Sequence, residues 1–143
     1  MLKERIMPMR ASAIFVAAML VALPASAASV LNEPPAEPYK KVSTLVRFPD
    51  FAPGLGTLYV DPNTLPEGPF LAYDHKGHLV STIYMVPLKD MDAQKNFADL
   101  ASPGGKVDHI SLNYNAGHPG VEEPHYHIIL WHVPKSEEVT VAK

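Results

Sequence analysis

Two stretches near the C-terminal end decide the fold: VDHISLNYN (residues 107–115) and HYHIILWHV (residues 125–133). Successive side chains of a β-strand point to opposite faces of the sheet, and the even-numbered positions 110–114 and 126–130 are all apolar. We therefore predict an antiparallel hairpin whose even-numbered side chains form one continuous buried face across the loop 116–124. The side chains expected on that face are Ile110, Leu112, Tyr114, Tyr126, Ile128 and Leu130.

The opposite face of this hairpin carries a cluster of histidines. His125 and His127 form a His-x-His pair, which on an extended strand points both imidazoles to the same side. In the predicted register Asn113 and Asn115 share their face, while His132 falls on the apolar face and is not expected to be a ligand.

These histidines predict a binding site for a divalent transition metal, because neutral imidazole is the commonest protein ligand for such ions. A third imidazole can fold back from the connecting loop, and a neighbouring carboxylate can add an oxygen ligand. Zinc, copper(II) and non-haem iron all fit this donor set, and a small polar ligand or a purely structural role stays open. The candidate ligands are His118, His125 and His127, together with Glu122 and Glu123.

The N-terminal segment has the pattern of a secretory signal peptide. Lys3, Arg5 and Arg10 precede an apolar run over residues 11–23, and Ala25-Ser26-Ala27 matches a cleavage site. We therefore expect residues 1–27 to be removed and the protein to be periplasmic or secreted. The absence of cysteine excludes disulfides and thiolate metal sites.

The rest of the chain predicts a single domain. Residues 28–40 read as an exposed proline-rich leader, and residues 41–143 as one β-rich domain. A helix is expected near 88–101, where Asp90 can cap the start and Met91, Phe97 and Leu100 have helical spacing. The fold class is α+β and β-rich, with a largely antiparallel sheet or a small barrel.

Composition limits the partners. The full chain has a formal net charge of −3 and no basic patch, so nucleic-acid binding is not expected. No segment after residue 27 is long and apolar enough to span a membrane. Fifteen prolines argue against a helical bundle.

A family resemblance follows from the loop and the second strand. Tyr114-Asn115-Ala116-Gly117-His118-Pro119 and Glu123-Pro124-His125-Tyr126 resemble the Asn-x-x-Gly-His-x-Pro and Pro-His-Phe-Asp-x-His segments of a family of small secreted bacterial domains of unknown function, typified by a sigma-E-regulated Thermus protein. The resemblance covers about residues 106–134. This chain departs from the family pattern at His127, where the family has Asp, and at Ile129, where it has its second histidine. The resemblance implies a β-rich fold and self-association as a homo-oligomer, and it implies no activity.

Three functional classes remain open. The first is a non-catalytic domain that binds a metal ion or small polar ligand through the histidine cluster. The second is a cupin-like metal-dependent oxygenase, because cupins also carry His-x-His on a strand. The third is an envelope-stress or structural interaction protein. No Gly-x-Ser-x-Gly, phosphate-loop or dinucleotide motif supports another enzyme class.

Overall fold

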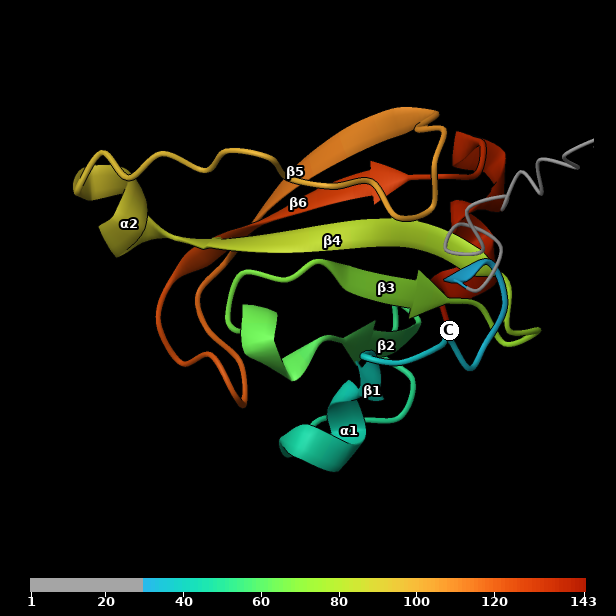
Figure 1. Ribbon diagram of the computed structural model, residues 1–143. Helices are drawn as coiled ribbons and strands as arrows, with labels where there is room; N and C mark the ends of the chain where they lie inside the picture. Colours follow the sequence, from blue (N-terminus) through green and yellow to red (C-terminus); the bar gives the residue numbers. More distant parts are fainter. Residues whose placement is uncertain (1–29) are drawn as a thin grey trace, which may run out of the picture.

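The strands form one antiparallel sheet of six strands, in the order β1-β2-β3-β4-β6-β5 (Figure 1). The structure is a computed structural model that describes residues 30–143, so the signal peptide predicted for residues 1–27 lies outside the described residues. The sheet is open rather than closed into a barrel, and the β-rich fold class is confirmed. The strands are β1 (Lys40–Lys41), β2 (Thr57–Val60), β3 (Phe70–Tyr73), β4 (Leu79–Pro87), β5 (His109–Asn115) and β6 (His125–Trp131).

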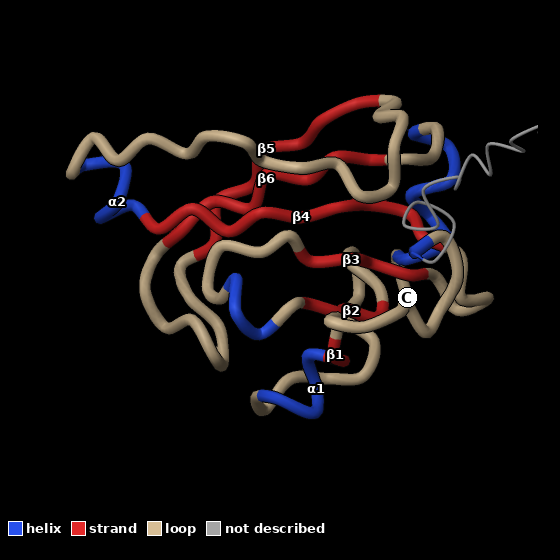
Figure 2. Tube along the Cα trace, in the orientation of Figure 1, coloured by secondary structure: helices blue, strands red, loops and turns tan. Residues whose placement is uncertain are grey.

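The helical segments are short, and most of the chain between the strands is loop (Figure 2). They are α1 (Val42–Leu45), the 3-10 turn η2 (Pro62–Thr64), α2 (Leu88–Asp92) and the 3-10 helix η3 (Lys135–Val141). No helix among residues 30–143 is long and apolar enough to cross a membrane.

The helix predicted near 88–101 is much shorter than expected. It begins at Leu88 as predicted and ends at Asp92, and Gln94 has a positive φ of 57° that is incompatible with its continuation. Met91 and Leu100 are 51% and 43% exposed, so the apolar stripe finds little surface to bury against. A helix without a buried face has little to stabilise it, so the chain after Asp92 adopts a loop conformation instead.

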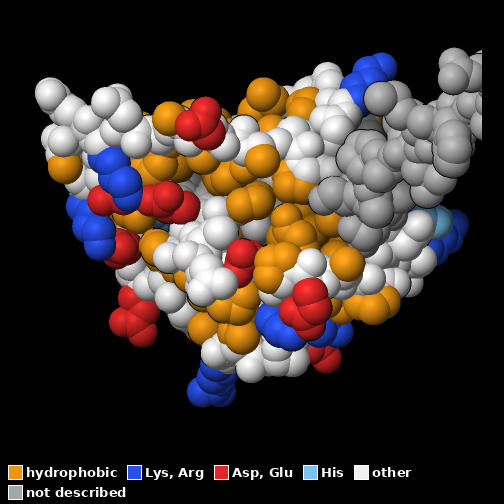
Figure 3. All heavy atoms as spheres, viewed as in Figure 1, with side chains coloured by type: hydrophobic (Ala, Val, Ile, Leu, Met, Phe, Trp, Pro, Cys, Tyr) orange, Lys and Arg blue, Asp and Glu red, His pale blue; other side chains and the backbone are white. Residues whose placement is uncertain are grey.

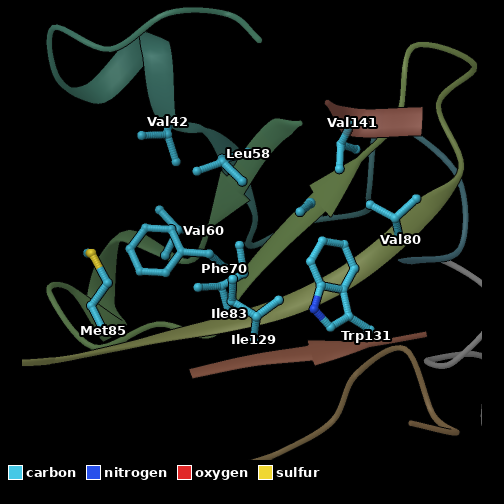
Figure 4. Packing of buried hydrophobic residues seen from close by; sticks show 11 residues of the cluster. Val42, Leu58, Val60, Phe70, Val80, Ile83, Met85, Ile129, Trp131 and Val141 are labelled. Atoms are coloured by element: carbon cyan, nitrogen blue, oxygen red, sulfur yellow. The ribbon is translucent and has the colours of Figure 1, made fainter. Parts of the chain in front are cut away.

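The main hydrophobic core lies on one face of the sheet. Strands β2, β3 and β4 are buried along their whole length. Figure 4 shows Val42, Leu58, Phe70 and Met85 at one end of the cluster, and Trp131 at the other. The core comprises Val42, Leu58, Val60, Phe70, Ala72, Val80, Ile83, Met85, Ile129, Trp131 and Val141.

The other face of β2 and β3 is covered by residues 30–40. Val30 is buried, and its carbonyl oxygen accepts a hydrogen bond of 2.7 Å from the Tyr73 hydroxyl. Glu33 also donates a backbone hydrogen bond of 2.8 Å to the carbonyl oxygen of Gly77. Most of residues 31–40 are exposed, as expected for the leader, but Val30 and Tyr39 pack against the domain. Because β2 and β3 are apolar on both faces, they require cover on both.

The hairpin of β5 and β6 has the predicted register. Ile110 lies opposite Leu130, Leu112 opposite Ile128, and Asn113 opposite His127. The pairing of the apolar positions is therefore confirmed.

The prediction of which face is buried is wrong. Ile110, Leu112 and Tyr114 are 63%, 61% and 57% exposed, while Ile129 and Trp131 are 1% and 4% exposed. The two faces of β6 are both apolar beyond His127, so the alternation alone does not identify the core side. The large side chains of Ile129 and Trp131 join the main core, and His125 and His127 face the core side with them.

Candidate metal site

The structure brings together His118, His125 and His127. One ring nitrogen from each lies within 4.8 Å of the other two. His125 is fully buried, His127 is 7% exposed, and His118 is half-buried. The Nε2 atoms of His125 and His127 are 3.0 Å apart. The convergence expected from the sequence is therefore present in the fold.

Strand pairing positions the first two histidines of the site. His125 lies between Pro87 of β4 and Asn115 of β5, and His127 lies between Met85 and Asn113. Strand β6 is thus flanked on both sides, which fixes the two imidazoles at one end of the core face. Rings held in this way lose little further freedom when they bind a ligand.

The third histidine is positioned by a tight loop. His118 and Val121 exchange two backbone hydrogen bonds of 2.9 Å, which close the turn. Gly117 precedes it with a φ of +127°, and a Cβ at this position would meet the carbonyl oxygen of Glu122. The close approach of the two backbone segments therefore requires glycine. Phe48 packs edge-on against the His118 ring, with centroids 5.9 Å apart.

Backbone carbonyl groups orient two of the imidazoles. The Nδ1 of His125 lies 2.7 Å from the carbonyl oxygen of Glu123, and the Nδ1 of His118 lies 3.1 Å from that of Pro119. Because a carbonyl oxygen only accepts, each Nδ1 carries the proton and donates, so in the neutral ring Nε2 is the atom that carries the lone pair. In His125 this atom faces the Nε2 of His127. Metal-ligating histidines characteristically donate their second ring nitrogen to such an outer partner.

The nitrogen spacing suits a common metal ion. Two nitrogens bound to one zinc ion at about 2.0 to 2.1 Å lie about 2.9 Å apart at a right angle and about 3.3 Å apart at the tetrahedral angle. The observed 3.0 Å between the Nε2 atoms of His125 and His127 falls at the lower end of this range. One nitrogen of His118 lies within 4.8 Å of both, so a three-nitrogen set requires the His118 ring to move closer to the other two.

Burial keeps His127 neutral. Desolvation, followed by the neighbouring His125 and His118, lowers the pKa of His127 to about 4. A neutral imidazole is the form that binds metal ions, so His127 needs no deprotonation at neutral pH.

The two glutamates do not join the site. The carboxylate of Glu123 forms an ion pair of 2.8 Å with Lys89, and Glu122 is exposed to solvent. Neither belongs to the group of converging ligand atoms. The oxygen ligand expected from Glu122 or Glu123 is therefore not in place, because the turn that holds His118 leaves this part of the loop outside the cluster.

A cavity beside the histidines was missed by the sequence analysis. It has a volume of about 110 Å³. His118 and His127 form part of its wall, and the other lining side chains are apolar. No sequence signal identifies it, because most of its wall comes from residues 42–70, far from the hairpin. The lining residues are Val42, Val46, Phe48, Leu55, Leu58, Leu65, Pro66, Phe70, Ile83, Met85, His118, Pro119, Gly120, Val121 and His127.

Two other histidines have separate roles. His132 points to the opposite face, as predicted, and its Nε2 forms a hydrogen bond of 2.8 Å with the hydroxyl of Thr82. His109 lies between the carboxylates of Glu138 and Asp108, at 2.6 and 2.9 Å, and these raise its pKa. Both lie outside the cluster of three.

Comparison with known proteins places the chain in a family. The TTHB210-like family, described as hypothetical protein TTHB210, matches residues 74–114. The crystal structure of hypothetical protein TTHB210 from Thermus thermophilus is 48% identical and superimposes with a TM-score of 0.59, and the match covers 66% of this chain and 92% of that one. No curated protein matches the chain. At this identity and coverage, the chain belongs to the TTHB210-like family.

Proposed function

We propose that this protein is an exported domain that binds one divalent transition-metal ion through His118, His125 and His127. The observation that carries the proposal is the pair of buried imidazoles with Nε2 atoms 3.0 Å apart. A third imidazole lies nearby, and backbone carbonyls accept from Nδ1 of two of the three rings, which leaves Nε2 as the lone-pair atom that faces the cluster. If the pair had only a structural role, a hydrogen bond between His125 and His127 would suffice and His118 would not be needed beside them.

The donor set favours metals that accept imidazole. Three nitrogens suit zinc, copper(II) or iron and leave a coordination position open. In the described part of the chain no carboxylate belongs to the converging group, so the hard cations magnesium and calcium are poor candidates. Export through the signal peptide at residues 1–27 would place the site in the periplasm or outside the cell.

The fold gives no support to the cupin-like oxygenase. Cupins are built on two-sheet jelly rolls, whereas the strands here form one open sheet. Glu122 and Glu123, which could have supplied a carboxylate ligand, lie outside the converging group.

Calorimetric titration of metal-stripped protein with zinc tests the proposal. We expect one ion per chain, and His118→Gln should weaken binding by at least about tenfold because it removes one of three ligands. His118 is the best position for this variant, since it is half-buried in a loop while His125 and His127 lie in the core. His78→Gln is the matched control, because its side chain is 62% exposed beside Asp74. Equal zinc affinity in wild type and His118→Gln would contradict the three-histidine site.

A second function, assembly with another copy of the chain, is favoured by the exposed face of the hairpin. Ile110, Leu112 and Tyr114 stand in a row on β5, more than half exposed. Strand β5 is also an edge of the sheet, so one side of its backbone has no neighbouring strand among the described residues. Contiguous exposed apolar residues on a sheet edge are typical of association surfaces.

A further inference from the structure

The open side of the proposed metal site adjoins an apolar cavity. The cavity is walled by α1, by the loops around Phe48 and Leu65, by the core side chains Phe70 and Met85, and by the loop 118–121. Figure 4 shows Val42, Leu58, Phe70 and Met85 directed toward one another at this end of the core. Hydrophobic side chains also reach the surface over the centre of the sheet in Figure 3, so apolar surface is not confined to the interior.

The polar groups of the cavity wall are concentrated at one place. Of the side chains that line it, only those of His118 and His127 carry a nitrogen or oxygen atom. The same two imidazoles belong to the proposed metal site. A molecule in the cavity would therefore meet aliphatic and aromatic carbon on most sides and the metal site on one.

This cavity is poorly suited to water. A buried water molecule needs two to four polar partners, and cavities lined by leucine, isoleucine and phenylalanine stay dry. The wall here includes Leu58, Ile83 and Phe70, which offer none. A ligand that fills such a space gains apolar burial and displaces little ordered water.

We propose that the cavity binds a small apolar molecule that carries one metal-coordinating group, with the apolar body among Val46, Phe70 and Met85 and the head directed at the ion held by the histidines. The inference rests on the proposed metal function for its head group, but not for the apolar body. Ligand sites of this composition, largely apolar with a few converging polar groups, are the usual form of small-molecule sites.

The cavity volume sets the size of the ligand. About 110 Å³ is somewhat smaller than the engineered cavity of about 150 Å³ that binds benzene. A single ring or a short branched chain fits within this space.

Methionine methyl groups give a direct readout of occupancy. Met85 and Met91 are the two methionines in the described part of the chain; Met85 lines the cavity, and Met91 is half exposed on α2. In protein labelled with ¹³C-methyl methionine, a cavity ligand should shift the Met85 signal and leave the Met91 signal unchanged. The signals are assigned with Met85→Leu and Met91→Leu.

Three probes separate the cavity from the metal. Toluene has no coordinating group, so it tests whether the cavity binds an apolar body alone. It should shift the methyl signal of Met85 in metal-free protein. Benzoate carries a carboxylate head and should bind cobalt(II)-loaded protein at least about tenfold more tightly than metal-free protein, and more tightly than acetate. The visible spectrum of bound cobalt(II) reports metal binding independently of the probe.

Val46→Phe fills the cavity and keeps the histidines. We expect it to abolish the response of Met85 to toluene and benzoate, while cobalt(II) still binds. Val139→Phe is the matched control, because Val139 is 70% exposed on η3. Val121→Phe, in the loop 118–121 of the cavity wall, serves as a second cavity variant if Val46→Phe does not fold.

The outcomes are distinguishable. Absence of a Met85 shift at saturating toluene and benzoate would overturn the cavity proposal, even if cobalt(II) binds. A toluene shift together with equal benzoate affinity in loaded and metal-free protein would overturn the head-group assignment. A protein that binds toluene but no cobalt(II) would refute the metal function and, with it, the coordinating head.

Discussion

His127 lies where a positive charge is least favourable, because burial and two neighbouring imidazoles lower its pKa to about 4. In the unfolded chain the pKa returns to about 6.5, so between these values the unfolded state binds more protons. The stability of the metal-free protein should therefore fall as the pH drops from about 6.5 to 4, by about 1 to 3 kcal/mol. Urea unfolding at pH 7 and pH 4.5 measures this difference.

The control for this pH dependence is His127→Gln, which keeps a polar side chain but does not titrate. Its free energy of unfolding should depend less on pH than that of the wild type over the same range. If both proteins show the same change between pH 7 and pH 4.5, other groups dominate the acid response and His127 is not the cause.

Gly117 illustrates how a residue outside the ligand set can control the site. Its φ of +127° and its contact with the Glu122 backbone leave no room for a side chain. Gly117→Ala should destabilise the protein by about 1 to 3 kcal/mol through backbone strain, and it should also weaken zinc binding by displacing His118. Thermal unfolding and calorimetry measure the two effects.

Gly105→Ala is the control for the Gly117 variant. Gly105 also has a positive φ, of 81°, but a Cβ at this position would meet nothing within 4 Å. Equal zinc affinities in the two variants would argue against displacement of His118.

The elements show which side of the hairpin carries the stability. Ile129 is 1% exposed in the core, whereas Ile110 is 63% exposed on the opposite face. Ile129→Ala should lower the free energy of unfolding by about 2 to 4 kcal/mol, and Ile110→Ala by less than about 1 kcal/mol. Urea unfolding at a concentration where the protein is monomeric tests this pair. A larger loss for Ile110→Ala would show that the even-numbered face is the buried one after all.

The sequence could predict the pairing of β5 and β6, but not which face they bury. The alternation of apolar residues fixes which positions lie opposite each other, and the observed partners agree. The face depends on Ile129 and Trp131 packing with side chains of β2, β3 and β4, which are distant in sequence. His125 and His127 lie on the same buried face. Replacement of both is therefore expected to disturb the fold, whereas replacement of two solvent-facing histidines would not.

The convergence of the three histidines could be predicted for a local reason. His125 and His127 are two residues apart on one strand, and His118 lies in the adjoining loop, so their proximity needs only the hairpin. The role of Glu123 could not be predicted, because its partner Lys89 comes from α2 on another part of the chain. The cavity is beyond local inference, since it forms only when residues 42–70 pack over the sheet.

At the scale of the whole molecule, the fold covers its sheet unevenly. Residues 30–40 shield β2 and β3, and the segment after α2 reaches β4, where Ala101 accepts a hydrogen bond from Tyr84. The outer face of β5 has no such cover among residues 30–143, although its side chains are as apolar as those of the core. A second copy that packs this face against itself would bury the same row of side chains twice, as a two-fold interface does.

We therefore expect the protein to self-associate through β5, and the expectation agrees with the resemblance found in the sequence. Ile110→Lys with Leu112→Lys places like charges on the face and should shift the assembly toward monomer, because burying two unpaired ammonium groups is unfavourable. Light scattering coupled to size-exclusion chromatography measures the mass, and far-UV circular dichroism checks the fold. Leu65→Lys is the control, since Leu65 is 43% exposed on a different surface. A wild-type protein that is monomeric at high concentration would refute self-association through this face, and an oligomer of unchanged mass in the double variant would place the interface elsewhere.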